Sequence, residues 1–160
     1  MRFIVLAAAL LASGAAYAQE TKHGWGFQFR QDTFDKVVFP LSMMSEEGDS
    51  FDKATLAVAC GPNGKLVAFF QPSGFVSFDS SAKLQLRDGN GTREFTFSVG
   101  EVPHLAKRLM IDAGETEKLI DVFARADGQD VPFRSGEKQG AFSSIAARTT
   151  YDLLRQNCPK

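Results

Sequence analysis

The chain has 160 residues, of which 44% are hydrophobic, 23% charged and 11% aromatic. This composition is typical of a folded globular protein and excludes a disordered or collagen-like chain. The formal net charge of −1 provides no excess of basic residues for binding nucleic acid or an anionic membrane surface. Two cysteines and two histidines leave few ligands for a metal centre, so we expect no cofactor.

The first 18 residues have the pattern of a secretory signal peptide. Arg2 is followed by an apolar run over residues 3–11, and Ala16 and Ala18 put small side chains where a signal peptidase reads them. The run is too short to anchor the chain in a bilayer, and we expect no membrane span after cleavage. We therefore expect a cleaved leader over residues 1–18, a single domain over residues 19–160 and a periplasmic location.

Alternating apolar residues predict a mainly antiparallel β fold. Strands are expected at residues 25–29, 37–41, 56–60, 66–70, 84–86, 95–99, 119–126, 131–134 and 139–144. Turns rich in Gly, Asn, Asp and Pro separate many of them, at residues 61–64, 71–74, 88–91 and 127–129. We expect a sandwich-like arrangement or a curved sheet, in the α+β class because two segments depart from strand spacing.

The first of these segments is an expected internal helix over residues 101–113. Pro103 lies near its start, and Leu105 and Leu109 share one helical stripe. Gly114 is expected to end the helix.

The second segment is an expected C-terminal helix over residues 146–157. Tyr151 and Cys158 lie on its single apolar face, and Ser143 or Ser144 is expected to cap its start.

The two cysteines are expected to form a disulfide. Cys60 shares a strand face with Leu56 and Val58, and Cys158 ends the apolar face of the last helix, so both side chains should point inward. An exported protein matures in an oxidising compartment, which favours the bridge over two free thiols. The bridge would fasten the helix across the sheet.

Residues for catalysis or metal binding are sparse. His23 and His104 have no second ligand at metal-binding spacing, and no nucleophile motif or phosphate-binding loop occurs. The densest carboxylates, Asp112, Glu115 and Glu117, are expected to be a solvated connection rather than a glycosidase pair. We therefore expect no catalytic residues and no enzyme.

The aromatic content consists mainly of phenylalanine, with 15 Phe against two Tyr and one Trp. Phenylalanine is chiefly core material, whereas binding surfaces favour Tyr and Trp. An apolar groove formed by Trp25 with Phe27 and Phe29, or by Phe75 with Phe78, is the alternative. Arg87, Arg93 and Glu94 flank a predicted hairpin and are candidates for a polar contact patch, although a solvated hairpin rim is the default expectation.

The order of these features resembles the C-terminal domain of VasI-like accessory proteins of type VI secretion. The features are Trp25, the strand 56–60 with the pattern L-x-V-x-C, a helix at 103–110, a strand at 119–125, Phe142 and Cys158. Ala146 stands where that family usually has glycine after the last strand, and the link before Phe142 looks longer. The resemblance implies a β-rich, non-enzymatic domain of the cell envelope.

The sequence therefore predicts an exported binding or accessory module whose partner is another envelope or periplasmic protein. A first alternative is an inhibitor of a cell-wall-degrading or toxin enzyme, because residues 73–78 partly match the S-G-x-x-Y loop of one lysozyme-inhibitor family. A second alternative is a carrier of a small apolar ligand.

Overall fold

The computed structural model describes residues 24–32, 36–46, 52–72, 81–102 and 105–159. Within these residues the chain forms nine β-strands, two α-helices and one short 3₁₀ turn. The strands are β1 (Gly26–Gln31), β2 (Val38–Ser45), β3 (Thr55–Cys60), β4 (Leu66–Gln71), β5 (Ala82–Asp88), β6 (Gly91–Val102), β7 (Leu105–Ile111), β8 (Asp130–Ser135) and β9 (Lys138–Ser143). The helices are α1 (Ala113–Ala126) and α2 (Ala147–Asn157), and the 3₁₀ turn is η1 (Pro62–Gly64).

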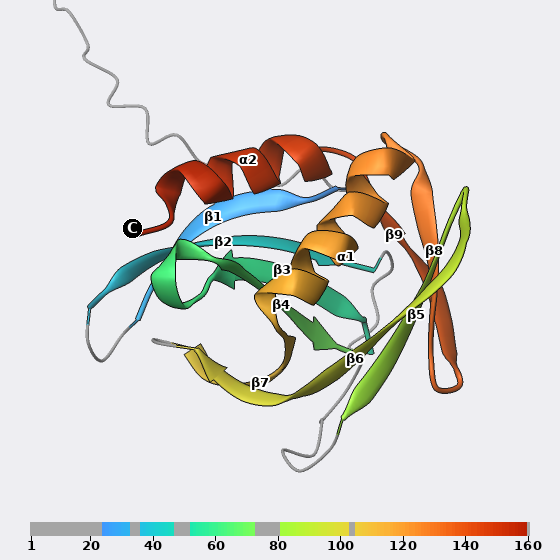
Figure 1. Cartoon of the computed structure of the whole chain (residues 1–160), viewed down its shortest axis with the longest axis horizontal. Helices are drawn as coiled ribbons and strands as arrows, with labels where there is room; N and C mark the ends of the chain where they lie inside the picture. The colour runs from blue at the N-terminus through green and yellow to red at the C-terminus, as the bar shows by residue number, and fades with distance from the viewer. Residues whose placement is uncertain (1–23, 33–35, 47–51, 73–80, 103–104, 160) are drawn as a thin grey trace, which may run out of the picture.

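The described strands form one antiparallel sheet in the order β1-β2-β3-β4-β7-β6-β5-β8-β9. The sheet is strongly curled, so its two edges approach each other (Figure 1). Trp25 N, just before β1, donates a hydrogen bond to Ile145 O, just after β9, at 2.9 Å. Lys138 Nζ on β9 lies 3.1 Å from Glu46 Oε2 beyond β2. The predicted mainly antiparallel, curved α+β fold is confirmed.

Strand β6 forms the bend of this sheet. It is 12 residues long; residues 91–97 pair with β5, and residues 98–102 pair with β7. The register of β6 with β7 shifts between Gly100 and Val102, and such a bulge increases the local twist of a strand. A β-carbon at Gly100 would overlap the Met110 side chain, so glycine leaves room for this side chain of β7.

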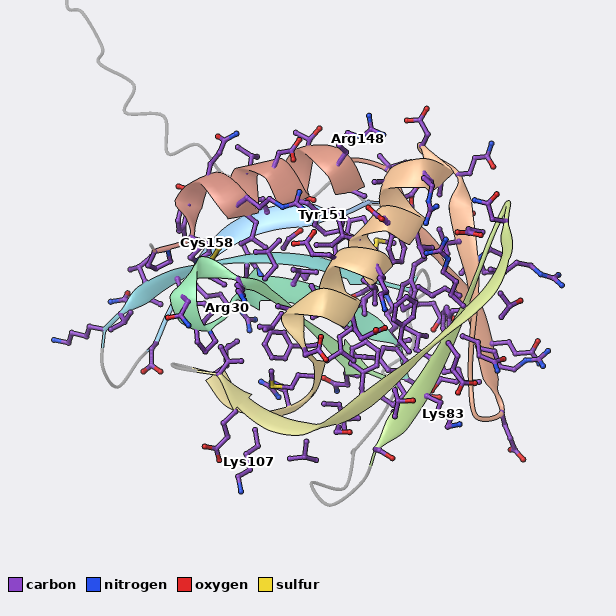
Figure 2. All side chains as sticks on the ribbon, viewed as in Figure 1. Arg30, Lys83, Lys107, Arg148, Tyr151 and Cys158 are labelled. Atoms are coloured by element: carbon purple, nitrogen blue, oxygen red, sulfur yellow. A yellow bond between two sulfur atoms is a disulfide. The ribbon has the colours of Figure 1, made fainter. Side chains whose placement is uncertain are left out.

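The main hydrophobic core lies between the concave face of the sheet and the two helices (Figure 1). Helix α2 packs on β1, β2 and β3, and α1 packs on β4, β5, β8 and α2. At the centre, the Trp25 ring lies 5.1 Å from Phe123 and 4.9 Å from Tyr151, both in edge-on contacts. Burial on the inner side of α2 (Figure 2) raises the pKa of Tyr151 well above its ordinary value, so its phenol stays neutral.

The outer face of β2, β3 and β4 carries a second apolar cluster. It comprises the buried residues Leu41, Ala59, Val67, Phe69 and Val102. Val102 comes from the far end of β6, so the β6–β7 hairpin covers part of this outer face. Strand β4 is therefore buried on both sides, which explains the continuous apolar run predicted as a strand at residues 66–70.

The predicted internal helix over residues 101–113 is wrong, and so is the strand predicted at residues 119–126. Residues 101 and 102 end β6, the following β7 is a strand, and helix α1 begins at Ala113. Asp112 caps α1, since its side chain accepts a hydrogen bond from Glu115 N at 2.9 Å. Gly114, expected to end a helix, lies in the first turn of α1. Four apolar side chains at helical spacing face the core: Leu119, Ile120, Val122 and Phe123.

A buried threonine joins helix α1 to the sheet. Thr116 Oγ1 accepts a hydrogen bond from Ala68 N on β4 at 2.9 Å. The same hydroxyl lies 2.8 Å from Asp112 O and donates to it. The bond from Ala68 N satisfies a buried backbone amide of β4, and it fixes the position of the first turn of α1 on that strand.

Helix α2 confirms the predicted C-terminal helix, but its expected serine cap is wrong. Ala146 is the N-cap residue, it makes no side-chain cap bond, and its φ of 60° is left-handed. Ser143 Oγ instead accepts from Ile145 N at 3.2 Å. Ser144 Oγ accepts from Gly128 N at 2.8 Å, which ties the turn after α1 to the start of α2.

The predicted disulfide is confirmed. Cys60 at the end of β3 and Cys158 after α2 are bonded, with Cα atoms 5.4 Å apart and 98 residues of sequence separation. Figure 2 shows Cys158 at the C-terminal end of α2, over the sheet. The bridge fixes the last helix against β3.

Replacing both cysteines, Cys60→Ala with Cys158→Ala, should lower the free energy of unfolding by about 4 kcal/mol, since the bridge closes a loop of nearly one hundred residues. Urea unfolding of the oxidised wild type and the double variant measures the difference. A loss below about 1 kcal/mol would contradict a stabilising role for the bridge.

Replacing Ala146 by glycine should stabilise the fold by about 0.5–1 kcal/mol, because glycine adopts a left-handed conformation without steric cost. Ala147→Gly is the matched control: Ala147 is fully buried at the start of α2, so this change should destabilise by about 1 kcal/mol. Thermal unfolding of the two variants should therefore shift in opposite directions; a loss of stability in Ala146→Gly would refute the argument.

Candidate functional site

The predicted aromatic binding candidates do not meet in an exposed groove within the described residues. Trp25 is 1% exposed, so its role is packing in the core. Phe29 on β1 is exposed, and its ring contacts Phe27 at 5.2 Å. Phe75 and Phe78, together with the rest of the segment compared with an inhibitor loop, lie outside the described residues.

Arg87 and Arg93 flank the β5–β6 hairpin, but the structure places them on opposite faces of the sheet. Arg87 pairs with Thr92, and Arg93 pairs with Leu86, whose side chain is in the core. Because side chains alternate along a strand, Arg87 points to the outer face and Arg93 to the inner face. The two arginines therefore do not form a common patch.

Arg93 belongs to a structural ion cluster around Asp88. The Asp88 side chain is only 3% exposed, and Oδ2 lies 3.6 Å from Arg93 Nε and 3.9 Å from Arg125 Nη2 on α1. Oδ1 accepts a hydrogen bond from Asn90 N at 2.8 Å. Arg93 therefore stabilises the β5–β6 hairpin itself, and Arg125 joins this hairpin to the end of α1.

Arg87 lies instead beside Arg134, in a groove on the outer face of β5, β6, β8 and β9. The β5–β8 register pairs Gln85 with Arg134, and Arg87 is two residues further along the same face. The groove has a volume of about 240 Å³. Its other lining residues are Thr92, Pro132, Phe133 and Gln139. We call these residues, with Gln85, Arg87 and Arg134, the arginine groove.

The nearest carboxylate in the strand register is already engaged by other residues. Glu94 pairs with Gln85 across β5 and β6, accepts a hydrogen bond from Gln85 Nε2 at 3.0 Å, and lies 3.0 Å from Lys83 Nζ. The hydrogen bond from Gln85 is the largest cause that lowers the pKa of Glu94, and the hydrogen bond and charge of Lys83 lower it further. Its charge is balanced by Lys83, which leaves the guanidinium groups of the arginine groove available to an outside anion.

The arginines in the described part of the chain divide into two groups. Hydrogen bonds or ion pairs to the chain itself are made by Arg93, Arg125, Arg148 and Arg155. No such bond is present, within these residues, for Arg30, Arg87, Arg108 and Arg134. Each arginine of the second group lines one of two surface hollows, either the arginine groove or a second hollow described below.

Arg134 is the member of the site that the sequence did not indicate. It lies next to Arg87 only because β5 pairs with β8, two strands separated in sequence by β6, β7 and α1. No local pattern reports such a pairing. The sequence shows Arg134 on a predicted strand, but it does not show that Arg87 lies beside it.

No cluster of three or more His, Cys, Asp or Glu suited to a metal ion occurs among the residues described. The carboxylates near α1 have structural partners. Asp112 caps α1, Glu115 Oε1 lies 2.6 Å from Lys118 Nζ, and Glu117 Oε2 lies 2.6 Å from Arg155 Nη2. His23 and His104 lie outside the described residues.

Comparison with protein-family models, with curated proteins and with solved structures finds no match to this chain. In the part of the chain that the structure describes, neither helix is long and apolar enough to cross a membrane.

Arg93→Ala should lower the free energy of unfolding by about 1–2 kcal/mol, since it removes the nearer cation from a buried carboxylate. Arg87→Ala is the matched control and should change stability by less than about 0.5 kcal/mol, because the Arg87 side chain is exposed and makes no hydrogen bond or ion pair with the described residues. Urea unfolding measures both variants. Equal losses would show that Arg87 also has a structural role.

Proposed function

We propose that the protein is an exported, non-enzymatic binding module of the cell envelope, and that it recognises an acidic segment of a partner protein through the arginine groove. The observation that carries the proposal is the pair Arg87 and Arg134, two exposed guanidinium groups that line one groove and make no ion pair with the described residues. Guanidinium groups bind carboxylates with two parallel hydrogen bonds, so the pair favours Asp or Glu side chains.

The neutral residues of the groove favour a protein segment as the source of the carboxylates. Gln85, Thr92 and Gln139 offer amide and hydroxyl groups that can donate to or accept from a backbone. Complementary charge at an exposed polar surface increases the association rate and selects among partners more than it adds affinity. Fast and selective binding of modest affinity suits an accessory protein that binds and then releases its partner.

Two features support export. Residues 1–18 have the charge, apolar run and small residues of a signal peptide. The Cys60–Cys158 disulfide is a bond that persists in oxidising compartments and is rare in the cytosol. A periplasmic location is consistent with both.

The resemblance to VasI-like accessory domains extends the proposal to a secretion or envelope complex. Two features of the resemblance differ in the structure: residues 105–110 of the expected helix lie in strand β7, and the strand expected at residues 119–125 lies in helix α1. A helix, a strand, Phe142 and Cys158 still follow one another if α1 and β8 take the two places. Ala146 stands at the glycine position of that family and keeps a left-handed φ of 60°, the conformation that glycine favours. The proposed link to a secretion complex rests on this order of elements and on Ala146.

A hexaglutamate peptide is a defined probe of the arginine groove. In NMR titrations at low salt, amide shifts should concentrate around Arg87 and Arg134 and fade as ionic strength rises above about 0.15 M. The double variant Arg87→Glu with Arg134→Glu should abolish these shifts, because it reverses the charge of the groove. Lys65→Glu, an exposed cation in the β3–β4 turn, is the control and should keep them.

Shifts spread evenly over all exposed cations, or unchanged in the double variant, would refute the groove as the site. In cells, a photo-crosslinking residue at Gln139 should give one discrete adduct that the double variant loses.

The same cells test export: the protein should be released by osmotic shock with the mass of residues 19–160 and one disulfide. A cytosolic chain that retains its first 18 residues would contradict it.

A further inference from the structure

A second hollow of about 230 Å³ lies on the outer face of the sheet, over β2, β3, β4 and β7. Its lining is mainly apolar and comprises Leu41, Met43, Ala57, Phe69, Phe70 and Leu105. Thr55 and Gln71 add neutral polar groups, and no acidic residue is among its lining residues. This apolar hollow differs in character from the polar arginine groove.

The apolar hollow results from a small side chain between larger ones. Across three neighbouring strands, Met43 pairs with Ala57, and Ala57 pairs with Phe69 on the same outer face. A methyl group between a methionine and a phenylalanine leaves a depression in the row. Leu105, at the start of β7, bounds the hollow from the hairpin that covers this face.

Two cations stand at the sides of the apolar hollow. Arg30 lies on β1 and Arg108 on β7, and these strands flank β2, β3 and β4 in the sheet. Both side chains belong to exposed residues, and neither makes an ion pair or hydrogen bond within the described part of the chain. An apolar hollow with guanidinium groups at its edge is complementary to a molecule with an apolar body and an anionic end.

We propose that the apolar hollow binds a medium-chain fatty acid, with the hydrocarbon chain over Ala57 and the carboxylate paired with one of the two arginines at its edge, Arg30 or Arg108. The volume sets the size of the ligand. It is below the roughly 300–1,000 Å³ of pockets for drug-sized ligands, so it suits a single short chain rather than a two-chain lipid. The site is independent of the arginine groove, because the two hollows share no lining residue.

Isothermal titration with hexanoate, octanoate and decanoate, each below its micelle concentration, tests the proposal. Affinity should rise about fourfold per added methylene, the ratio expected for burying hydrocarbon. Decanol and decyltrimethylammonium should bind at least about tenfold more weakly than decanoate, since they lack the charge-assisted bonds. Absence of saturable decanoate binding, or equal affinity for decanoate and decanol, would overturn the proposal.

Variants locate the binding. Arg30→Gln with Arg108→Gln should weaken decanoate by at least about tenfold and leave decanol unchanged. Ala57→Leu should weaken both ligands, because its side chain fills the hollow. Arg87→Gln with Arg134→Gln is the matched control: it removes the same charge from the arginine groove and should leave decanoate affinity unchanged. Urea unfolding checks that each variant folds.

Two outcomes would assign the hollow differently. If decanoate binding falls equally in the Arg30/Arg108 and Arg87/Arg134 double variants, net charge alone drives it, and the proposal is refuted. If decanoate does not bind and Ala57→Leu abolishes the adduct formed in cells, the hollow takes an apolar side chain of a protein partner, which likewise refutes the fatty acid.

Discussion

The curl of the sheet depends on strand β6, which pairs with β5 along its first half and with β7 along its second. The partner changes between Phe97 and Ser98, and the bulge between Gly100 and Val102 adds local twist within the part that pairs with β7. The concave face thereby encloses α1 and the aromatic cluster around Trp25, while the outer face bends over β2, β3 and β4. Both hollows lie on the outer face of the sheet, the arginine groove over β5, β6, β8 and β9 and the apolar hollow over β2, β3, β4 and β7.

The charged residues follow a division between inner and outer surfaces. Arg93 and Arg125 hold the nearly buried Asp88, and Arg155 joins α2 to Glu117 on α1. These pairs connect hairpin, helix and sheet, and removing one partner leaves a charge without compensation. The exposed side chains of Arg87 and Arg134 make no ion pair with the residues that the structure describes, so replacing them should cost little stability.

Local patterns were sufficient where neighbours in sequence decide the structure. Alternation located the strands at residues 56–60 and 95–99, and inward-facing cysteines indicated the disulfide. The helix predicted at residues 101–113 is wrong because the spacing of Leu105 and Leu109 fits a helix, whereas pairing with β4 and β6 makes β7 a strand. Helix α1 is missed because its apolar residues form one short run over residues 119–123, a pattern that fits a buried strand as well as a helix. The arginine groove needed the β5–β8 pairing, which only the folded chain reveals.

The meeting of the sheet's two ends affects how this protein can associate with others. Strands β1 and β9 are each six residues long, they carry Arg30 and Lys138, and the bond from Trp25 N to Ile145 O closes one end of the gap between them. Short, charged edges discourage edge-to-edge aggregation. For the same reason, a partner protein is disfavoured from adding a strand to either edge through main-chain hydrogen bonds. Recognition of a partner through side chains is favoured instead.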